Sequence, residues 1–131
     1  MATTIRFLGA VKTVTGSRFL IESEKSKVMI DCGLYQGLKE LRLKNWAKFP
    51  VDPASIDAIV ISHAHLDHCG YLPKLVREGF DGPIYSTTYT AKLAAIVLRD
   101  AAKLQVEDAK YAKKKGYSKH KEPIALYDLE E

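Results

Sequence analysis

The sequence predicts an α/β fold, a mixed sheet with flanking helices, for a chain of 131 residues. Short apolar segments suited to strands fill the first part of the chain, and strands alternate with helices in the rest. The chain is long enough to bury one real core. Its apolar and charged fractions, 47% and 27%, are ordinary for a globular domain.

Five segments have the composition of strands: residues 4–8, 18–21, 28–30, 59–61 and 84–85. The first ends at Gly9. A short polar turn joins the second to the third, which favours antiparallel pairing of those two. The fifth follows the turn Asp81-Gly82-Pro83.

Helices are expected between and after the later strands. Residues 71–78 form a short helix, with Pro73 in its first turn and Gly79 as its stop. Residues 38–46 suit either a helix or an irregular excursion, and Pro50 and Pro53 exclude a regular helix in the region that follows.

The longest predicted element is a helix over residues 88–115. Thr87 or Thr88 can cap its start, and Gly116 can end it. Its apolar residues recur at helical spacing and are expected to pack against the sheet: Leu93, Ile96, Val97, Ala101 and Leu104.

Chemistry is concentrated in the motif H-x-H-x-D-H, which directly follows the apolar strand 59–61. Its members are His63, His65, Asp67 and His68. Imidazole and carboxylate are the ligands that zinc and similar divalent metals prefer. A loop can turn all four inward, and the C-terminal end of a strand is where open α/β folds usually place ligands. Four polar residues in a surface turn would be the plainer interpretation.

This motif resembles that of metallo-β-lactamase-fold hydrolases, whose fold is an αββα sandwich. Further segments in the same order are similar to the β-CASP branch, the nucleic-acid-processing members of that superfamily: Val14-Thr15-Gly16-Ser17, Asp31-Cys32-Gly33-Leu34-Tyr35-Gln36-Gly37, Gly70-Tyr71-Leu72-Pro73 and Gly82-Pro83-Ile84-Tyr85. The resemblance covers nearly the whole chain.

The resemblance implies a site with two zinc ions. His63 and His65 would bind the first ion, and Asp67 and His68 the second. Two such ions polarise a substrate oxygen and generate a hydroxide nucleophile near neutral pH. Asp67 is also the expected catalytic residue that orients the attacking water, and RNA is the implied substrate.

Asp31 is the second residue for which the resemblance implies a catalytic role, since the family's aspartate at this place lies near the metals. Such residues fix the tautomer of metal-bound histidines; an Asx-turn residue stabilising its own loop is the alternative. Thiolates also bind zinc. Cys32 and Cys69, however, match no ligand position of the family and suit small buried residues.

The resemblance also implies elements that we do not find in the sequence. These are a further histidine for the first metal, a bridging aspartate, a last histidine for the second metal and an inserted cap domain. His120 is the only histidine after His68, and it suits a solvated surface position. Residues 1–131 are therefore expected to be the N-terminal portion of a metallo-β-lactamase domain, with the second half and the β-CASP cap absent.

Three functions are compatible with these features. The first is a portion of a β-CASP ribonuclease. The second is another hydrolase of this fold, such as a thioesterase of the glyoxalase II kind, although a second glycine is then expected where Tyr71 follows Gly70. The third is a non-catalytic half-domain that binds a partner or self-associates. An uncovered sheet or helix face predicts a homo-oligomer.

Charge and composition limit partners and location. The net charge of +4 suits a polyanion. Residues 110–121 contain six lysines together with Tyr111 and Tyr117, which can meet phosphates and bases or can form a solvated helix end. No membrane span and no signal peptide are recognisable. Two cysteines do not make a disulfide framework, which favours the cytoplasm.

Overall fold

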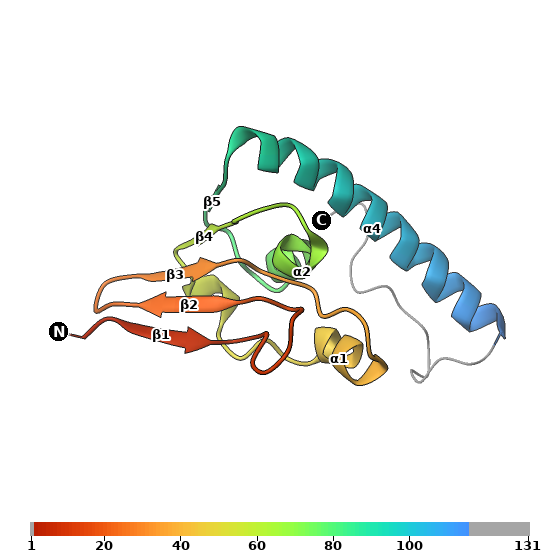
Figure 1. Cartoon of the computed structure of the whole chain (residues 1–131), viewed down its shortest axis with the longest axis horizontal. Helices are drawn as coiled ribbons and strands as arrows, with labels where there is room; N and C mark the ends of the chain where they lie inside the picture. The colour runs from red at the N-terminus through yellow and green to blue at the C-terminus, as the bar shows by residue number, and fades with distance from the viewer. Residues whose placement is uncertain (1, 116–131) are drawn as a thin grey trace.

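A five-stranded mixed sheet forms the centre of the chain (Figure 1). The computed structural model describes residues 2–115, with side chains as far as Tyr111. The strands lie in chain order: β1 (Thr4–Phe7), β2 (Phe19–Glu22), β3 (Lys27–Ile30), β4 (Ala58–Val60) and β5 (Ile84–Tyr85). β1, β2 and β3 pair antiparallel, whereas β3, β4 and β5 pair parallel. The predicted mixed sheet is confirmed, and each strand starts within one residue of its predicted position.

Helices fill the connections of the later strands. They are α1 (Lys39–Leu43), the 3-10 turns η1 (Lys44–Trp46) and η2 (Pro53–Ser55), α2 (Leu66–Cys69), α3 (Leu72–Arg77) and α4 (Thr88–Lys115). Thr87 is the N-cap of α4, because its Oγ1 accepts a hydrogen bond from the Thr90 amide at 3.2 Å. The predicted end at Gly116 lies outside the described residues. Within residues 2–115, no helix has the length and hydropathy needed to cross a bilayer.

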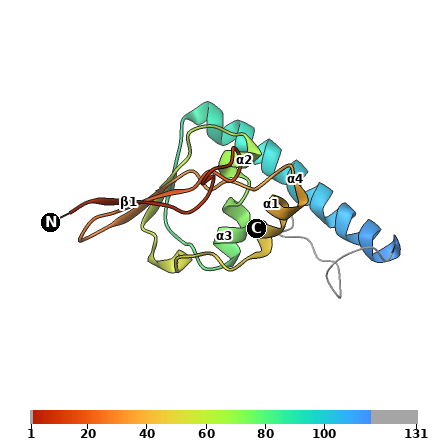
Figure 2. The ribbon, with the colours of Figure 1, turned by 60° about the horizontal axis from the view of Figure 1, so that its bottom comes forward.

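One face of the sheet carries the core. Leu20, Met29 and Ile59 stand in register across β2, β3 and β4, and none of them is exposed. Leu75 of α3, also fully buried, packs into the same cluster. Figure 2 shows α3 to one side of the strands, so that the helices close this face of the sheet.

The opposite face of the sheet is apolar but open. Phe7, Phe19, Ile30, Val60 and Tyr85 form one row across all five strands. Phe7, Val60 and Tyr85 are 64%, 40% and 58% exposed. In Figure 1 no helix is drawn across β1, β2 and β3 on the side of the viewer. Among the described residues, no layer covers this face.

The predicted packing face of α4 is wrong for its large residues. Leu93, Ile96 and Leu104 are 52%, 67% and 49% exposed. The face that packs on the core lies about one position further along: Ala94, Leu98, Ala101 and Ala102. Of the predicted stripe, Ala101 is buried and Val97 is half-buried. Both faces of α4 carry apolar residues at helical spacing, and the face that packs on the core is the one rich in alanine, whose small side chains suit close helix packing.

The orientation of α4 predicts that the same Leu→Ala substitution has different effects on stability on its two faces. Leu98→Ala removes methyl groups that pack on the core and should lower the free energy of unfolding by about 1–3 kcal/mol. Leu93→Ala, on the exposed side, should cost less than about 1 kcal/mol. Urea denaturation of both variants measures the difference. Equal losses, or a larger loss for Leu93→Ala, would contradict this packing.

Candidate metal centre

The H-x-H-x-D-H loop and Asp31 meet at one edge of the sheet because β3 and β4 are parallel neighbours. Asp31 follows β3, and residues 61–65 follow β4 and lead into α2. Backbone hydrogen bonds hold the two segments together: the Asp31 amide donates to the Val60 carbonyl at 2.8 Å, and the Cys32 amide donates to the His68 carbonyl at 2.8 Å. The carboxyl ends of the two strands thus form a common rim.

Asp31 is the anchor of this rim. It is 4% exposed and adopts a left-handed backbone with φ of 61°, which is uncommon for any residue except glycine. Its Oδ1 accepts from the Ser62 amide at 2.8 Å. Its Oδ2 accepts from the Ser62 hydroxyl at 2.8 Å and from His68 Nδ1 at 2.7 Å. These contacts reach more than thirty residues along the chain, so the carboxylate links two segments rather than capping its own turn.

The hydrogen-bond network determines the tautomers of two histidines. Ser62 has one hydroxyl hydrogen, which it donates to Asp31, so its oxygen accepts from His63 Nδ1 at 2.9 Å. His68 donates from Nδ1 as well. Because Nδ1 of each ring is the donor in these contacts, Nε2 is the ring nitrogen left to bind a metal when the ring is neutral.

The loop brings the three imidazoles together. The ring centroids of His63 and His65 lie 4.7 Å apart, and those of His63 and His68 lie 4.0 Å apart. The rings pack on one another, and within residues 2–115 no three His, Cys, Asp or Glu side chains converge as a ready metal site. The predicted ligands are therefore neighbours, and the imidazole rings must turn before they can share a metal.

The chemistry of the donors nevertheless fits a divalent cation. Asp67 Oδ2 lies 3.4 Å from His68 Nε2. A positive charge between these two atoms stabilises the contact. A proton on Nε2 supplies that charge in the imidazolium form, and a metal ion bound by both atoms would supply it in place of the proton.

Gly33 allows the segments behind the loop to pack closely. A Cβ at this position would lie 1.8 Å from the Asp67 carbonyl oxygen and 2.7 Å from the Ser17 amide nitrogen. The Ser17 amide in turn donates to the Asp67 carbonyl at 3.0 Å. The loop is thus supported by backbone from the Val14–Ser17 motif and from the segment after β3.

Arg18 is a buried residue of this region that the sequence did not single out. It is 3% exposed, and its Nε donates to the Gly33 carbonyl at 2.9 Å. The guanidinium carbon lies 4.2 Å from the Tyr71 ring centroid, 5.0 Å from that of Tyr35 and 5.6 Å from that of Phe49. These contacts are cation–π interactions. Ser62 was missed as well, although its place directly before the motif was visible.

Both thiols have the properties of small buried residues. Cys32 and Cys69 are 0% exposed. Burial raises the pKa of the Cys32 thiol to about 12 and that of the Cys69 thiol to about 11. Both residues therefore have the burial and the protonated thiol of small core residues, as the sequence predicted.

Most of the candidate RNA-binding and metal-binding residues near the C-terminus lie outside the described residues. His120, Tyr117 and the lysines of the 110–121 run after Lys110 lie outside the described side chains. Lys110 is exposed, and Tyr111 is 55% exposed.

Comparison with known proteins identifies the family of the chain. The sequence profile of the Metallo-beta-lactamase superfamily matches residues 13–128. A ribonuclease of Thermus thermophilus is 50% identical over 99 residues, which cover 76% of this chain and 22% of that protein. Transcription termination factor FttA of Methanocaldococcus jannaschii is 33% identical over 125 residues, 92% of this chain and 20% of that protein.

A solved metallo-β-lactamase of Cronobacter sakazakii supports the fold alone. It superposes with a TM-score of 0.53 at 23% identity, over 73% of this chain and 33% of that one. The chain belongs to the metallo-β-lactamase superfamily, which binds metal ions, generally zinc, and its curated relatives are RNA-processing nucleases of the β-CASP type. The resemblance seen in the motifs is thereby confirmed. The chain spans about a fifth of the length of these relatives.

The network around Asp31 predicts that an isosteric amide is not tolerated. Asp31→Asn replaces the buried Oδ2 acceptor, leaving the donors of His68 and Ser62 without it. We expect a loss of about 2 kcal/mol in the free energy of unfolding, measured by urea denaturation. Asp57→Asn is the matched control, because exposed Asp57 accepts one hydrogen bond, from the Lys27 amide, and should cost less than about 0.5 kcal/mol. Equal effects would contradict the role of Asp31.

Proposed function

We propose that residues 1–131 form the N-terminal, metal-binding portion of a β-CASP ribonuclease that cleaves RNA phosphodiesters with two zinc ions. The observation that carries the proposal is the arrangement of His63, His68 and Asp67 on the rim, where Asp31 holds the Nδ1 side of both imidazoles, directly for His68 and through Ser62 for His63. The relatives point to the same chemistry, since one is named a ribonuclease. The second half of the domain and the cap would belong to a longer protein.

In this proposal His63 and His65 hold one ion, and Asp67 and His68 hold the other. The ions, when bound, supply Lewis-acid polarisation of a phosphoryl oxygen and activation of water near neutral pH. The chain's own residues prepare the site. Asp31 keeps the proton of His68 on Nδ1, and it does the same for His63 through the hydroxyl of Ser62. Asp67, half-buried beside His68, would orient the attacking water in this proposal.

The alternatives receive less support. A thioesterase of the glyoxalase II kind shares the motif, but Tyr71 and Leu72 follow Gly70 here and are buried at the start of α3, and the curated relatives are RNA-processing proteins. The third candidate, a self-associating half-domain, is compatible with the first, because it concerns the open sheet face rather than the loop. Two protonated thiols and an RNA substrate fit a cytoplasmic location.

Metal binding is the first test of the proposal. Calorimetric titration of the full chain with zinc should show weak binding, because each ion would lack ligands. Its binding free energy should be well below the roughly 10–16 kcal/mol of closed structural zinc sites. His63→Ala combined with His65→Ala should remove binding at the first position. His120→Ala, the remaining histidine of the chain, should leave the titration unchanged. Tight binding that survives loss of His63 and His65 would sink the assignment.

Catalysis is the second test. The chain of 131 residues should cleave single-stranded RNA slowly or not at all with zinc or manganese, because in-line displacement needs two ions fixed about 3.5–4 Å apart by a full set of ligands. In a longer protein that contains this chain, Asp67→Ala should abolish cleavage. If the 131-residue chain cleaves RNA robustly and Asp67→Ala abolishes that cleavage, the site is not incomplete, but the assignment of the metal ligands stands. Cleavage indifferent to Asp67→Ala would instead indicate a contaminant.

Self-association is a further part of the proposal. The open row of apolar residues on β1, β4 and β5 favours burial against a second copy of the chain, which would stand in for the missing layer. Light scattering should give a dimer or larger species. Phe7→Ser combined with Tyr85→Ser should shift the mass toward the monomer. Tyr89→Ser, the same kind of substitution at an exposed position of α4, should not. A clean monomer of the unmodified chain at high concentration counts against association.

A further inference from the structure

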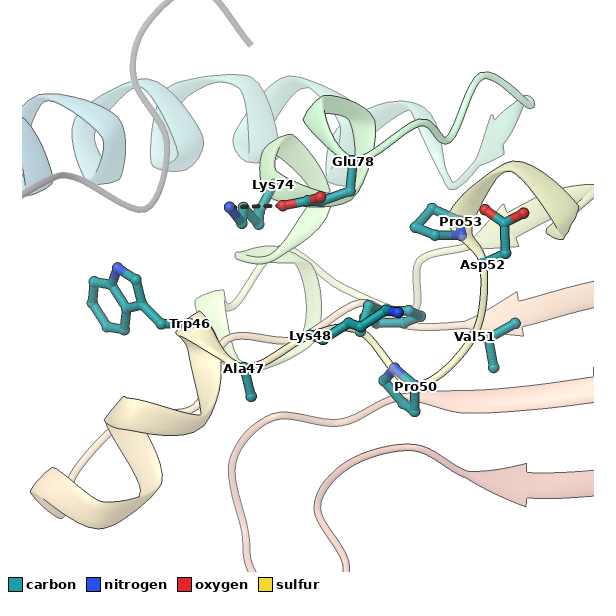
Figure 3. Close-up of a pocket in the computed structure, with 10 residues that line it drawn as sticks. Trp46, Ala47, Lys48, Pro50, Val51, Asp52, Pro53, Lys74 and Glu78 are labelled. Carbon is teal, nitrogen blue, oxygen red and sulfur yellow. Dashed lines mark ion pairs between the residues drawn. The ribbon is translucent and has the colours of Figure 1, made fainter.

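A second concave site lies away from the metal loop, between α3 and the segment that joins η1 to η2. The cavity measures about 670 Å³ and is lined by residues 46–53 on one side and by Lys74 and Glu78 on the other (Figure 3). Its volume is in the range of ligand-binding pockets. None of the predicted metal ligands lines it.

The pocket combines a flat aromatic surface with cations. Trp46 is 39% exposed at one end. Phe49, which is 7% exposed, lines the interior and stacks on Tyr71 at a centroid distance of 5.7 Å and an interplanar angle of 25°. Figure 3 shows the side chains of Lys48 and Lys74 along the same pocket. An aromatic face beside lysines is the surface on which unpaired bases stack while phosphates meet the cations.

The chain leading into the pocket is strongly basic. Residues 39–48, named here the basic segment, contain Lys39, Arg42, Lys44 and Lys48 against Glu40 alone, which is a net charge of +3. All four cations are exposed, and within the described residues none of them pairs with a carboxylate.

The pocket's own charges balance, because two lysines and two acids line it. Glu78 pairs with Lys74 at 2.8 Å, and Asp52, whose Oδ1 accepts from the Ala54 amide at 3.1 Å, keeps its charge. The excess positive charge therefore lies on the rest of the basic segment, where a phosphate chain would run.

The basic segment is rigidly connected to the metal loop. The Asn45 side chain, 3% exposed, accepts from the Tyr35 amide at 2.8 Å and donates to the Tyr35 carbonyl at 2.9 Å. The neighbouring Leu34 amide donates to the Leu66 carbonyl at 2.9 Å. A strand of nucleic acid held on the basic segment is thus held at a fixed position relative to the loop.

We propose that the basic segment and its pocket bind single-stranded RNA, with one base stacked on Trp46 and the adjoining phosphates on Lys44 and Lys48. The inference rests on the proposed ribonuclease function and names a binding site for its substrate outside the metal loop. An acidic peptide would use the same lysines, but it has no planar group for Trp46, and the pocket's aromatic lining favours RNA.

Trp46 is the single tryptophan of the chain and reports directly on this site. The full chain is titrated with a single-stranded RNA 12-mer in EDTA, so that binding is measured without metal or cleavage. Stacking of a base should quench the fluorescence of Trp46. In parallel, the anisotropy of a labelled RNA gives the affinity of variants. Trp46→Ala should weaken binding about 5- to 150-fold, the effect of losing one stacked base, and Trp46→Phe should restore most of it.

Charge is tested by the salt dependence. Lys44→Gln combined with Lys48→Gln should make the slope of log K against log salt shallower by about 1.4, because each phosphate contact on a single strand contributes about 0.7. The control pair Lys92→Gln with Lys103→Gln changes the same charge at exposed positions of α4 and should leave the slope unchanged. Thermal unfolding of each variant verifies the fold.

Three results would overturn the assignment: RNA binding that leaves Trp46 fluorescence unchanged, a control pair that lowers the slope as much as the test pair, or polyglutamate that displaces RNA and quenches Trp46 equally well. The last would identify an acidic-peptide site. Failure here leaves the zinc titration untouched, whereas failure of the zinc titration leaves this RNA measurement standing, so the two proposals fail separately.

Discussion

The buried carboxylate of Asp31 is the constraint on which the site and much of the fold depend. It sits at the end of β3 in a strained backbone conformation, and all three of its hydrogen bonds come from residues beyond β4. A buried charge is tolerated only where such donors are present. The parallel pairing of β3 with β4 brings those donors into place, so the arrangement of the histidines depends on the sheet.

The two faces of the sheet show how the fold relates to its superfamily. The helices close the face of Leu20, Met29 and Ile59, and the row that contains Phe7 and Tyr85 stays open. In an αββα sandwich two sheets face each other, so the open row corresponds to the inner face of one sheet, which a second sheet would cover. Under the proposed function, the layer that covers this face and the remaining metal ligands would both come from the second half of the domain.

Much of this architecture could be predicted from the sequence because it depends on local signals. Strand composition, Pro73 in a first helical turn and the density of ligands between His63 and His68 are visible without coordinates. The packing face of α4 could not be predicted, because its alanine face and its leucine face have the same period and contacts with the rest of the core decide between them. Arg18 was missed for a related reason: an arginine at the start of a strand reads as exposed until three aromatic rings from distant segments surround it.

The order of the strands in the sheet is also their order in the chain. Each new strand therefore pairs with one that has already been synthesised, and the sheet can grow by one edge as the polypeptide leaves the ribosome. The Asp31 carboxylate, however, is made before Ser62 and His68 exist. During synthesis this aspartate must stay hydrated until the loop emerges, and the histidines acquire their final tautomers only when the nascent chain has passed residue 68.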